Sequence, residues 1–313
     1  MELKVSKFKR FLEKRNNRNA LFIAAVAAIP VLQFLIFYVY LNFNTVIMAF
    51  QTYVTDKTTG IGSYKWCAFD NFVRAYHEYL PSGLLWKQLK NTAFYFLTCT
   101  CVITPFALLF SYYIYKKRFA SQIFKIVLFM PSIISSIIIV LMYNYFMEIA
   151  VPKALGSLFK MNVGPLISTK ETAFITVLFY CVWTGFGTGI LMYSGAMGGI
   201  SESVVEAACM DGATMMKEFW HVTLPSVYPT LSTFLIAQLA GVFIADMNLF
   251  SFFGSEAEGY IKTIGYDLLR LTRGATYAEY PYLAAIGLML TMITLPIAYG
   301  GKYLINKLGP TTE

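Results

Sequence analysis

Long apolar stretches alternate with polar links along most of the chain. In a helix that rises about 1.5 Å per residue, about 20 apolar residues cross a hydrocarbon core of about 30 Å. Six stretches are long enough, at about residues 20–43, 92–115, 123–147, 172–192, 227–245 and 283–305. The pattern therefore predicts an all-α polytopic membrane protein of about six transmembrane helices, which form a single unit over residues 20–308.

The composition supports this interpretation. The 313 residues are 57% hydrophobic and 13% charged, whereas globular proteins carry charge at about 25% of positions. The first stretch is longer than a signal-peptide core of about 7 to 15 residues, and no small-residue cleavage site follows it, so we expect it to remain as the first span. The five cysteines form no CxxC pair and show no metal-ligand spacing, so neither a disulfide framework nor a metal site is expected.

The net charge of +8 has an uneven distribution that predicts the orientation in the membrane. Seven basic residues precede the first span: Lys4, Lys7, Lys9, Arg10, Lys14, Arg15 and Arg18. Four more lie in or just after the link between the second and third spans: Lys116, Lys117, Arg118 and Lys125. Basic residues in short flanking segments favour the cytoplasmic side. Both termini, as tails 1–19 and 309–313, are therefore expected in the cytoplasm of a multi-pass membrane protein. A basic membrane flank explains these charges without nucleic-acid binding.

Polar and aromatic side chains in or near the spans predict a candidate solute path. Polar groups at membrane depth are costly and usually face a bundle interior or a wet cavity. Rings and amides together suit a sugar, which offers an apolar face and many hydroxyls. The candidates are Tyr143, Asn144, Tyr180, Trp183, Gln238 and Asn248. Ordinary helix packing or interfacial anchoring explains each of them equally well.

Six glycines crowd the end of the fourth apolar stretch: Gly185, Gly187, Gly189, Gly195, Gly198 and Gly199. Their missing side chains permit either close helix packing or a break in the helix. Close packing is the simpler explanation.

The link between the fourth and fifth spans is long and internally ordered. Ser203 stands three residues before Glu206, which predicts a capping box at the start of a short helix over 201–208. Asp211 and Gly212 then favour a turn, and residues 213–220 predict a second short helix. That helix carries two apolar pairs, Met215 with Phe219 and Met216 with Trp220, which need either a partner or the lipid surface.

The same link resembles a known motif. Glu206, Ala207 and Ala208 are followed after three residues by Gly212, and after nine more by Val222, Thr223, Leu224 and Pro225. This is similar to the EAA loop of bacterial ABC importer permeases, EAA-x3-G-x9-I-x-LP, with Val222 in place of the usual Ile. The resemblance covers about residues 20–305. It implies an ATPase-coupling loop over 201–225, carried by Glu206, Ala207, Ala208, Asp211, Gly212, Met215, Phe219, Leu224 and Pro225.

Further residues resemble the carbohydrate branch of that family, the maltose-type or multiple-sugar permeases. They are Asn91-Thr92, Pro131-Ser132, Trp183, Gly187 and Asp211-Gly212-Ala213. The region 246–259 departs from the pattern. It lacks the TxGGP stretch that is usual in the first of the two permease subunits of such importers.

The resemblance implies a permease subunit of an ATP-driven importer for sugars or oligosaccharides in the bacterial cytoplasmic membrane. Its partners would be a homologous second permease subunit, two ATPase subunits, an extracytoplasmic solute-binding protein and membrane lipid. The chain would bind no cofactor and would not be an enzyme, with ATP and Mg on the partner ATPase. Consistent with this, no GxxxxGK[ST] loop occurs in the sequence.

Two other classes of function compete with this interpretation. An ion-coupled secondary transporter or channel would explain the spans and their polar residues but not the 201–225 loop. An intramembrane enzyme would need a nucleophile with a base, or paired carboxylates, at membrane depth. The two histidines, His77 and His221, lie outside the predicted spans, so no Ser/His dyad is expected there.

Overall fold

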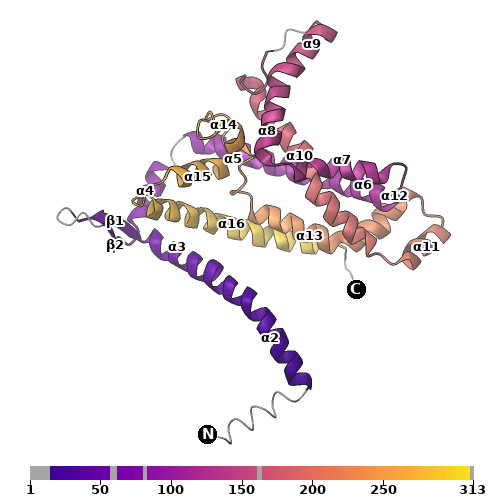
Figure 1. The fold of residues 1–313 in the computed structure, drawn as a ribbon, viewed down its shortest axis with the longest axis horizontal. Helices are drawn as coiled ribbons and strands as arrows, with labels where there is room; N and C mark the ends of the chain where they lie inside the picture. Colours follow the sequence, from indigo (N-terminus) through magenta and orange to yellow (C-terminus); the bar gives the residue numbers. More distant parts are fainter. Residues whose placement is uncertain (1–14, 57–61, 80–82, 161–163, 311–313) are drawn as a thin grey trace, which may run out of the picture. The chain divides into compact units, whose positions relative to one another are not determined.

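The computed structural model describes residues 15–56, 62–79, 83–160 and 164–310 (Figure 1). Most of the basic N-terminal tail and the last three residues lie outside these ranges. The chain divides into two compact units. Unit 1 comprises the residues up to Ala75 together with Thr276–Leu288, and unit 2 comprises Tyr76–Ala275 together with the residues from Met289 onward.

Unit 1 begins with a long apolar helix and continues into a small hairpin. The helix runs through α2 (Arg15–Phe34), the π-helical turn η1 (Leu35–Tyr40) and α3 (Leu41–Ala49). The hairpin pairs β1 (Gln51–Thr55) with β2 (Gly62–Trp66) in antiparallel register, so that Tyr53 stands opposite Tyr64. Asn71 joins helix and hairpin, because its amide donates to the carbonyl oxygens of Ala49 (2.9 Å) and Gln51 (2.7 Å). The sequence pattern had indicated only a link here.

Unit 2 holds the remaining helices, whose bounds follow in chain order. Two helices belong to both units: α4 (Asp70–Glu78) and α16 (Tyr280–Leu308) each begin in unit 1 and end in unit 2. The first group comprises α5 (Gly83–Thr98), η2 (Cys99–Ile103), α6 (Thr104–Tyr115), α7 (Ser121–Ile133), α8 (Ser136–Tyr145), η3 (Phe146–Ala150), α9 (Val151–Phe159) and α10 (Lys170–Gly198). The second comprises α11 (Glu202–Met210), α12 (Met215–Glu218), η4 (Phe219–Thr223), α13 (Leu224–Ala240), α14 (Leu249–Phe253) and α15 (Ile264–Gly274).

The helical polytopic architecture predicted from the sequence is confirmed. Within the described ranges, five helices are long and apolar enough to cross a membrane: Phe22–Ala49, Leu85–Tyr115, Ser136–Phe159, Lys170–Gly198 and Tyr280–Lys307. Two of the six predicted spans differ from expectation, the third and the fifth.

The predicted third span, 123–147, is not one helix. α7 ends at Ile133, Ile134 is extended (φ −72°, ψ 141°), and α8 starts after Ser135. Pro131 lies just before the break, and its ring nitrogen cannot donate the hydrogen bond that a regular helix needs. α8 instead continues through η3 into α9, so the long apolar helix here is Ser136–Phe159.

The predicted fifth span, 227–245, is shifted toward the N-terminus. Its α-helical part, α13, has 17 residues and ends at Ala240, with Gly241 as its C-cap. Helical structure without a gap extends from Met215 through η4 into α13. α13 itself begins at Leu224, with Pro225 in its first turn, so the chain passes from the 201–225 segment into the span without leaving helical structure. The π-helical turn η4 precedes Pro225, and such a turn changes the backbone pairing where proline offers no donor.

The core of unit 2 forms around α10, which packs along α6 and α7 (Figure 1). Three of the six glycines make this approach possible. A Cβ on Gly187 would lie 2.6 Å from the Ser132 hydroxyl, and one on Gly185 would lie 2.9 Å from Ile103. A Cβ on Gly189 would meet Ala107 at 3.2 Å. α10 remains one unbroken helix, so close packing explains these three glycines.

The segment between α14 and α15 is fixed to α5 by the Asn91-Thr92 pair. The Asn91 amide donates to the carbonyl oxygens of Tyr260 and Lys262, both at 2.9 Å, and the Thr92 hydroxyl accepts from the Ile264 amide. Gly265 allows α15 to meet the preceding chain, because a Cβ there would lie 2.4 Å from the Ile244 carbonyl oxygen.

Candidate functional site

The segment 201–225 begins with α11, a helix whose side chains lie mostly at the surface. Val204 is 48% exposed and Met210 is 88% exposed. Glu206 is also exposed, and within the described ranges it has no hydrogen bond or ion pair. The predicted capping box is wrong. The N-cap is Ser201, which makes no capping bond, and its hydroxyl lies 2.8 Å from that of Ser203.

The predicted turn at Asp211 and Gly212 is confirmed, and its hydrogen bonds define its type. The Ala213 amide donates to the Ala208 carbonyl, and the Gly212 amide donates to the Cys209 carbonyl, both at 3.0 Å. This pairing is the Schellman motif, which requires a left-handed residue after the helix. Gly212 has φ +75°, a conformation that costs a residue with a side chain about 1 kcal/mol or more.

After the turn, the chain becomes part of a longer helix and enters the protein. The predicted short helix over 213–220 is therefore not separate, because α12 and η4 continue into α13. Glu218 and Phe219 are each 3% exposed, and Thr223 is fully buried. Trp220 is 57% exposed and Met216 is 60% exposed. This helix therefore has a buried side, with Glu218, Phe219 and Thr223, and an exposed side, with Met216 and Trp220.

The buried side of this helix is fixed to the end of α6. The Tyr112 hydroxyl donates to the Met215 carbonyl at 3.0 Å, and the rings of Tyr112 and Phe219 lie 5.0 Å apart. The Lys116 ammonium lies 2.5 Å from a Glu218 carboxylate oxygen. We call these five residues, Tyr112, Lys116, Met215, Glu218 and Phe219, the α6 joint.

The α6 joint combines three kinds of interaction, and all of them resist movement of the segment along α6. A hydrogen bond fixes the position, a ring contact fills space, and an ion pair compensates a carboxylate that is 4% exposed. Removing Lys116 would leave the Glu218 carboxylate with little solvent to replace its partner, whereas Lys116 itself is 19% exposed. Movement of the 201–225 segment must therefore carry the end of α6 with it.

The structure changes the role expected for Phe219. Sequence reasoning predicted it as an apolar anchor for a partner, but its ring packs inside the chain against Tyr112. Within the described ranges, the exposed apolar side chains of the segment are Val204, Met210, Met215, Met216 and Trp220. We call this set the apolar face. Of the remaining predicted residues, Ala207 and Asp211 are exposed, and Ala208, Leu224 and Pro225 are half-buried.

Tyr112, Lys116 and Glu218 were missed by sequence reasoning. Lys116 was interpreted only as a membrane flank. Glu218 follows Lys217 in the sequence, so nothing local indicates that its carboxylate is buried. Its partner lies 102 positions away, a separation that no local pattern reveals.

Three of the six predicted path residues lie together. The rings of Tyr143 and Tyr180 are 5.1 Å apart, and the Trp183 ring stacks on Tyr143 at 6.2 Å. Phe252 completes this aromatic cluster, 5.0 Å from Tyr180. Tyr143 and Tyr180 are buried, at 5% and 1% exposed, whereas Trp183 is 40% exposed. Of the predicted path rings, Trp183 is therefore the most accessible to a solute.

The other three predicted path residues have different surroundings. The Gln238 amide donates to the Thr104 hydroxyl at 3.3 Å and accepts from the Thr100 hydroxyl at 3.4 Å, so it links α13 to the second span. Asn248 is the N-cap of α14 with φ +56°. Asn144 is half-buried beside Tyr143 in sequence. Within the described ranges, no side-chain hydrogen bond joins these three residues to the aromatic cluster.

The described residues do not form a metal site. Within the described ranges, no group of three or more His, Cys, Asp or Glu side chains could hold an ion. Glu148, near the end of a predicted span, has a structural role instead. Its carboxylate accepts from the backbone amides of Ile167 and Ser168 at 2.7 and 2.8 Å.

Comparison with known proteins adds an independent line of evidence. The profile of one family, described as "Binding-protein-dependent transport system inner membrane component", matches residues 103–309. The matched range includes the whole of the 201–225 segment and the α6 joint.

Two curated relatives illustrate the similarity in sequence. An arabinooligosaccharides transport system permease protein of Bacillus subtilis is 27% identical over 274 residues, which cover 86% of this chain and 83% of the relative. A multiple sugar-binding transport system permease protein of Streptococcus mutans is 28% identical over 173 residues, which cover 54% and 58%.

The fold is also similar to that of solved structures. A chain of a bacterial ABC transporter involved in the import of the acidic polysaccharide alginate matches with a TM-score of 0.73. The match covers 95% of this chain and 99% of that one, at 19% sequence identity. A second alginate transporter structure, in complex with a periplasmic protein bound to an alginate pentasaccharide, matches equally well.

Proposed function

Because the chain belongs to the family of binding-protein-dependent transport system inner membrane components, we propose that it is the permease subunit of an ATP-driven importer for sugars or oligosaccharides. In this role it forms half of the translocation path. The observation that carries the proposal is the dual character of the 201–225 segment. Its apolar face and Glu206 lie at the surface, while the α6 joint fixes the same segment to a membrane span.

The proposed partners follow from the surfaces that the segment leaves open. The apolar face suits a groove on an ATPase subunit, since short helices are recognised by a few apolar anchors. Glu206 offers a carboxylate for a basic group on that partner. A homologous second permease subunit, two ATPase subunits and an extracytoplasmic binding protein complete the proposed importer. ATP and Mg bind to the ATPase subunits and not to this chain.

The α6 joint gives this arrangement its mechanism. When nucleotide closes the ATPase pair, α11 moves with the groove that holds it. The Schellman turn and the joint then transfer that displacement to α6 and α13, which belong to the membrane bundle. A ligand that favours one state of the ATPase pair thereby shifts the outward and inward populations of the bundle.

The proposed orientation follows from the basic residues. Residues 1–19, the link after α6, the 201–225 segment and residues 309–313 face the cytoplasm. A cysteine in place of Thr58, which lies outside the described residues, should react with an impermeant maleimide in intact cells. A cysteine in place of Ser201 should stay unlabelled until the membrane is opened. The reverse pattern would contradict this orientation.

The solute class is supported by what the relatives are said to transport, and by one ring. The relatives' names refer to arabinooligosaccharides and to multiple sugars. A sugar stacks its apolar face on an aromatic ring and bonds its hydroxyls to polar groups. Trp183 offers such a ring, since it is 40% exposed while Tyr143 supports it from behind. Asn144, Gln238 and Asn248 remain candidate hydrogen-bonding groups along the path.

The test is reconstitution of the importer in vesicles with candidate binding proteins, each loaded with an oligosaccharide. We expect one sugar-loaded binding protein to stimulate both ATP hydrolysis and uptake. Trp183→Ala should raise the sugar concentration for half-maximal uptake. Phe179→Ala is the matched control, since Phe179 lies one turn earlier on α10, is 57% exposed and is outside the aromatic cluster. Stimulation by no sugar would contradict the proposed function, and equal effects of the two variants would remove Trp183 from the path.

A further inference from the structure

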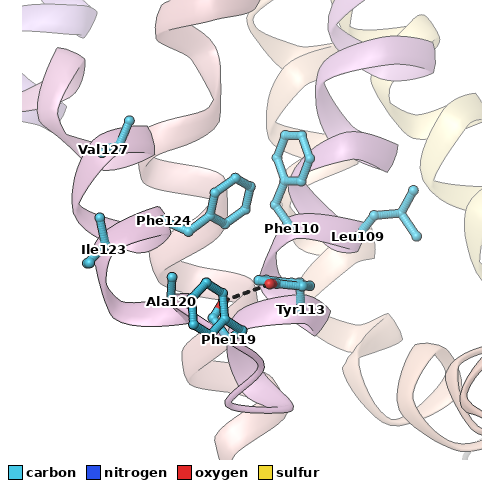
Figure 2. A pocket seen from close by; sticks show the side chains of 8 residues that line it. All are labelled: Leu109, Phe110, Tyr113, Phe119, Ala120, Ile123, Phe124 and Val127. Atoms are coloured by element: carbon cyan, nitrogen blue, oxygen red, sulfur yellow. Dashed lines mark hydrogen bonds between the residues drawn. The ribbon is translucent and has the colours of Figure 1, made fainter.

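An apolar groove lies where α6 passes the start of α7 (Figure 2). Its volume is about 570 Å³. α6 contributes Leu109, Phe110 and Tyr113, and α7 with the turn before it contributes Phe119, Ala120, Ile123, Phe124 and Val127. The groove is separate from the aromatic cluster and from the apolar face, and neither the sequence motif nor the transport function accounts for it.

The tight link between α6 and α7 shapes the groove. The Tyr113 hydroxyl donates to the Phe119 carbonyl at 2.7 Å, which draws the link back onto α6 (Figure 2). Lys117 and Ala120 both have positive φ, at 48° and 55°, as a turn this short requires. The rings of Phe110 and Phe124 meet edge to face at 5.4 Å between the two helices. The groove is therefore a consequence of defined contacts.

The chemistry of the walls selects an apolar ligand. The Tyr113 hydroxyl, the polar side-chain group of the lining, already has its partner in the link. Phe119 is 93% exposed and Ile123 is 65% exposed, so the chain itself leaves the groove uncovered. In a membrane protein, such a concave apolar surface is filled most readily by a lipid acyl chain.

Three basic residues adjoin the lining residues in sequence, and their charge selects the lipid headgroup. Lys117 and Arg118 directly precede Phe119, and Lys125 directly follows Phe124. Lys116 is already paired with Glu218. In the part of the chain that the structure describes, none of Lys117, Arg118 and Lys125 has a carboxylate within ion-pair distance. Basic groups beside a membrane span attract anionic lipid headgroups.

We propose that this groove is a binding site for an anionic phospholipid. One acyl chain lies between α6 and α7, and the phosphate lies near Lys117, Arg118 and Lys125. The site would adjoin the α6 joint, because the Arg118 guanidinium also contacts the Met215 sulfur. The inference requires only that the chain lies in a membrane, so it stands or falls independently of the transported solute.

The test uses Ile123→Trp as a probe in the groove and Ile126→Trp as its matched control. Both positions lie on α7 and are equally exposed, at 65% and 66%, but only Ile123 lines the groove. Each variant of the full chain is placed in phosphatidylcholine vesicles that contain the same fraction of brominated phosphatidylglycerol or brominated phosphatidylcholine. The measured quantity is quenching of the added tryptophan, relative to the parent protein. Melting temperatures of the variants are compared first, and Val127→Trp, which also lies in the groove, replaces Ile123→Trp if that variant does not fold.

At position 123 we expect the anionic lipid to quench about threefold more strongly than the neutral lipid, and at position 126 about equally. The combined change Lys117→Gln, Arg118→Gln and Lys125→Gln should abolish the preference at 123 while quenching by the neutral lipid persists. The pair Lys302→Gln and Lys307→Gln should leave the preference unchanged. Equal preferences at 123 and 126 would mean ordinary boundary lipid. No quenching at 123 would mean that protein covers the groove, and either result would overturn the proposal.

Discussion

The two halves of the 201–225 segment meet the rest of the chain in opposite ways. Before Gly212, α11 keeps Val204, Glu206 and Met210 at the surface. After Gly212, the chain buries Glu218 and Phe219 against the end of α6. Gly212, with φ +75°, therefore separates a half that lies at the surface from a half with one buried side, at Glu218 and Phe219, and one exposed side, at Met216 and Trp220.

This difference shows that one continuous motif can carry two functions that mutations can separate. Changes in the first half should leave the isolated subunit stable and weaken its association with a partner. Changes on the buried side of the second half should destabilise the subunit itself. Four sets of substitutions test this division, ordered by the expected loss of stability of the isolated subunit.

The largest loss is expected for Phe219→Ala. Phe219 is 3% exposed, and truncation of a buried phenylalanine costs about 3 to 5 kcal/mol. The neighbouring residue Trp220 is the matched control, because it is 57% exposed and its truncation should cost little in the free subunit. Unfolding by SDS titration in mixed micelles measures both variants. Equal losses would contradict the division between the two sides of this helix.

The next loss is expected at the ion pair, and it should be asymmetric. Lys116→Ala leaves the Glu218 carboxylate, 4% exposed, without its cation, at a cost of about 3 kcal/mol. Glu218→Gln leaves Lys116, which is 19% exposed and can reach water, so its cost should be about 1 to 2 kcal/mol. The double variant should lose less than the sum of the two. Additive losses in the same titration would mean that the two groups do not interact.

A smaller loss is expected for Gly212→Ala. Its Cβ would meet open space, so the cost is backbone strain alone, about 1 kcal/mol. Gly212→Asn should be tolerated better, because asparagine enters the left-handed region more readily. Gly198→Ala is the control, as it also faces open space but lies in α10 with an ordinary helical backbone. A Gly212→Ala variant as stable as Gly198→Ala would argue against the turn.

The smallest loss is expected for Glu206→Lys and Met210→Ser. Both side chains are exposed, so the change in unfolding free energy should stay within about 0.5 kcal/mol. If these residues contact the ATPase, co-purification of that subunit should fall sharply with either variant. Lys302→Gln, on an exposed position of α16, serves as the control and should co-purify normally. Full retention of the ATPase by both variants would remove α11 from the proposed interface.

Hydropathy was sufficient to predict most of the membrane architecture, because span length follows directly from bilayer thickness. It did not predict where helices break or join. The break at Ile134 and the continuity through Pro225 depend on local backbone geometry, which hydropathy does not encode. The hairpin of Gln51–Thr55 and Gly62–Trp66 was also missed, since the start of its first strand is anchored by Asn71, 20 positions from Gln51.

The 201–225 segment was located by its motif, and its turn was predicted from Asp211 and Gly212. Which of its apolar residues face inward was not predictable. Phe219 and Trp220 are adjacent and chemically similar, yet only Phe219 meets Tyr112. That choice depends on where α6 ends, and it is settled only when the two segments pack together.

The central claim is that this segment has a free half and a bound half, and cysteine accessibility tests it directly. In a cysteine-free background, single cysteines replace Met210 and Phe219 in the purified subunit, and their labelling by a maleimide is followed with and without the ATPase. We expect Cys at 210 to label rapidly and to be protected when the ATPase binds, and Cys at 219 to label slowly in both cases. Equal labelling of the two positions, or no protection at 210 by a bound ATPase, would contradict the account.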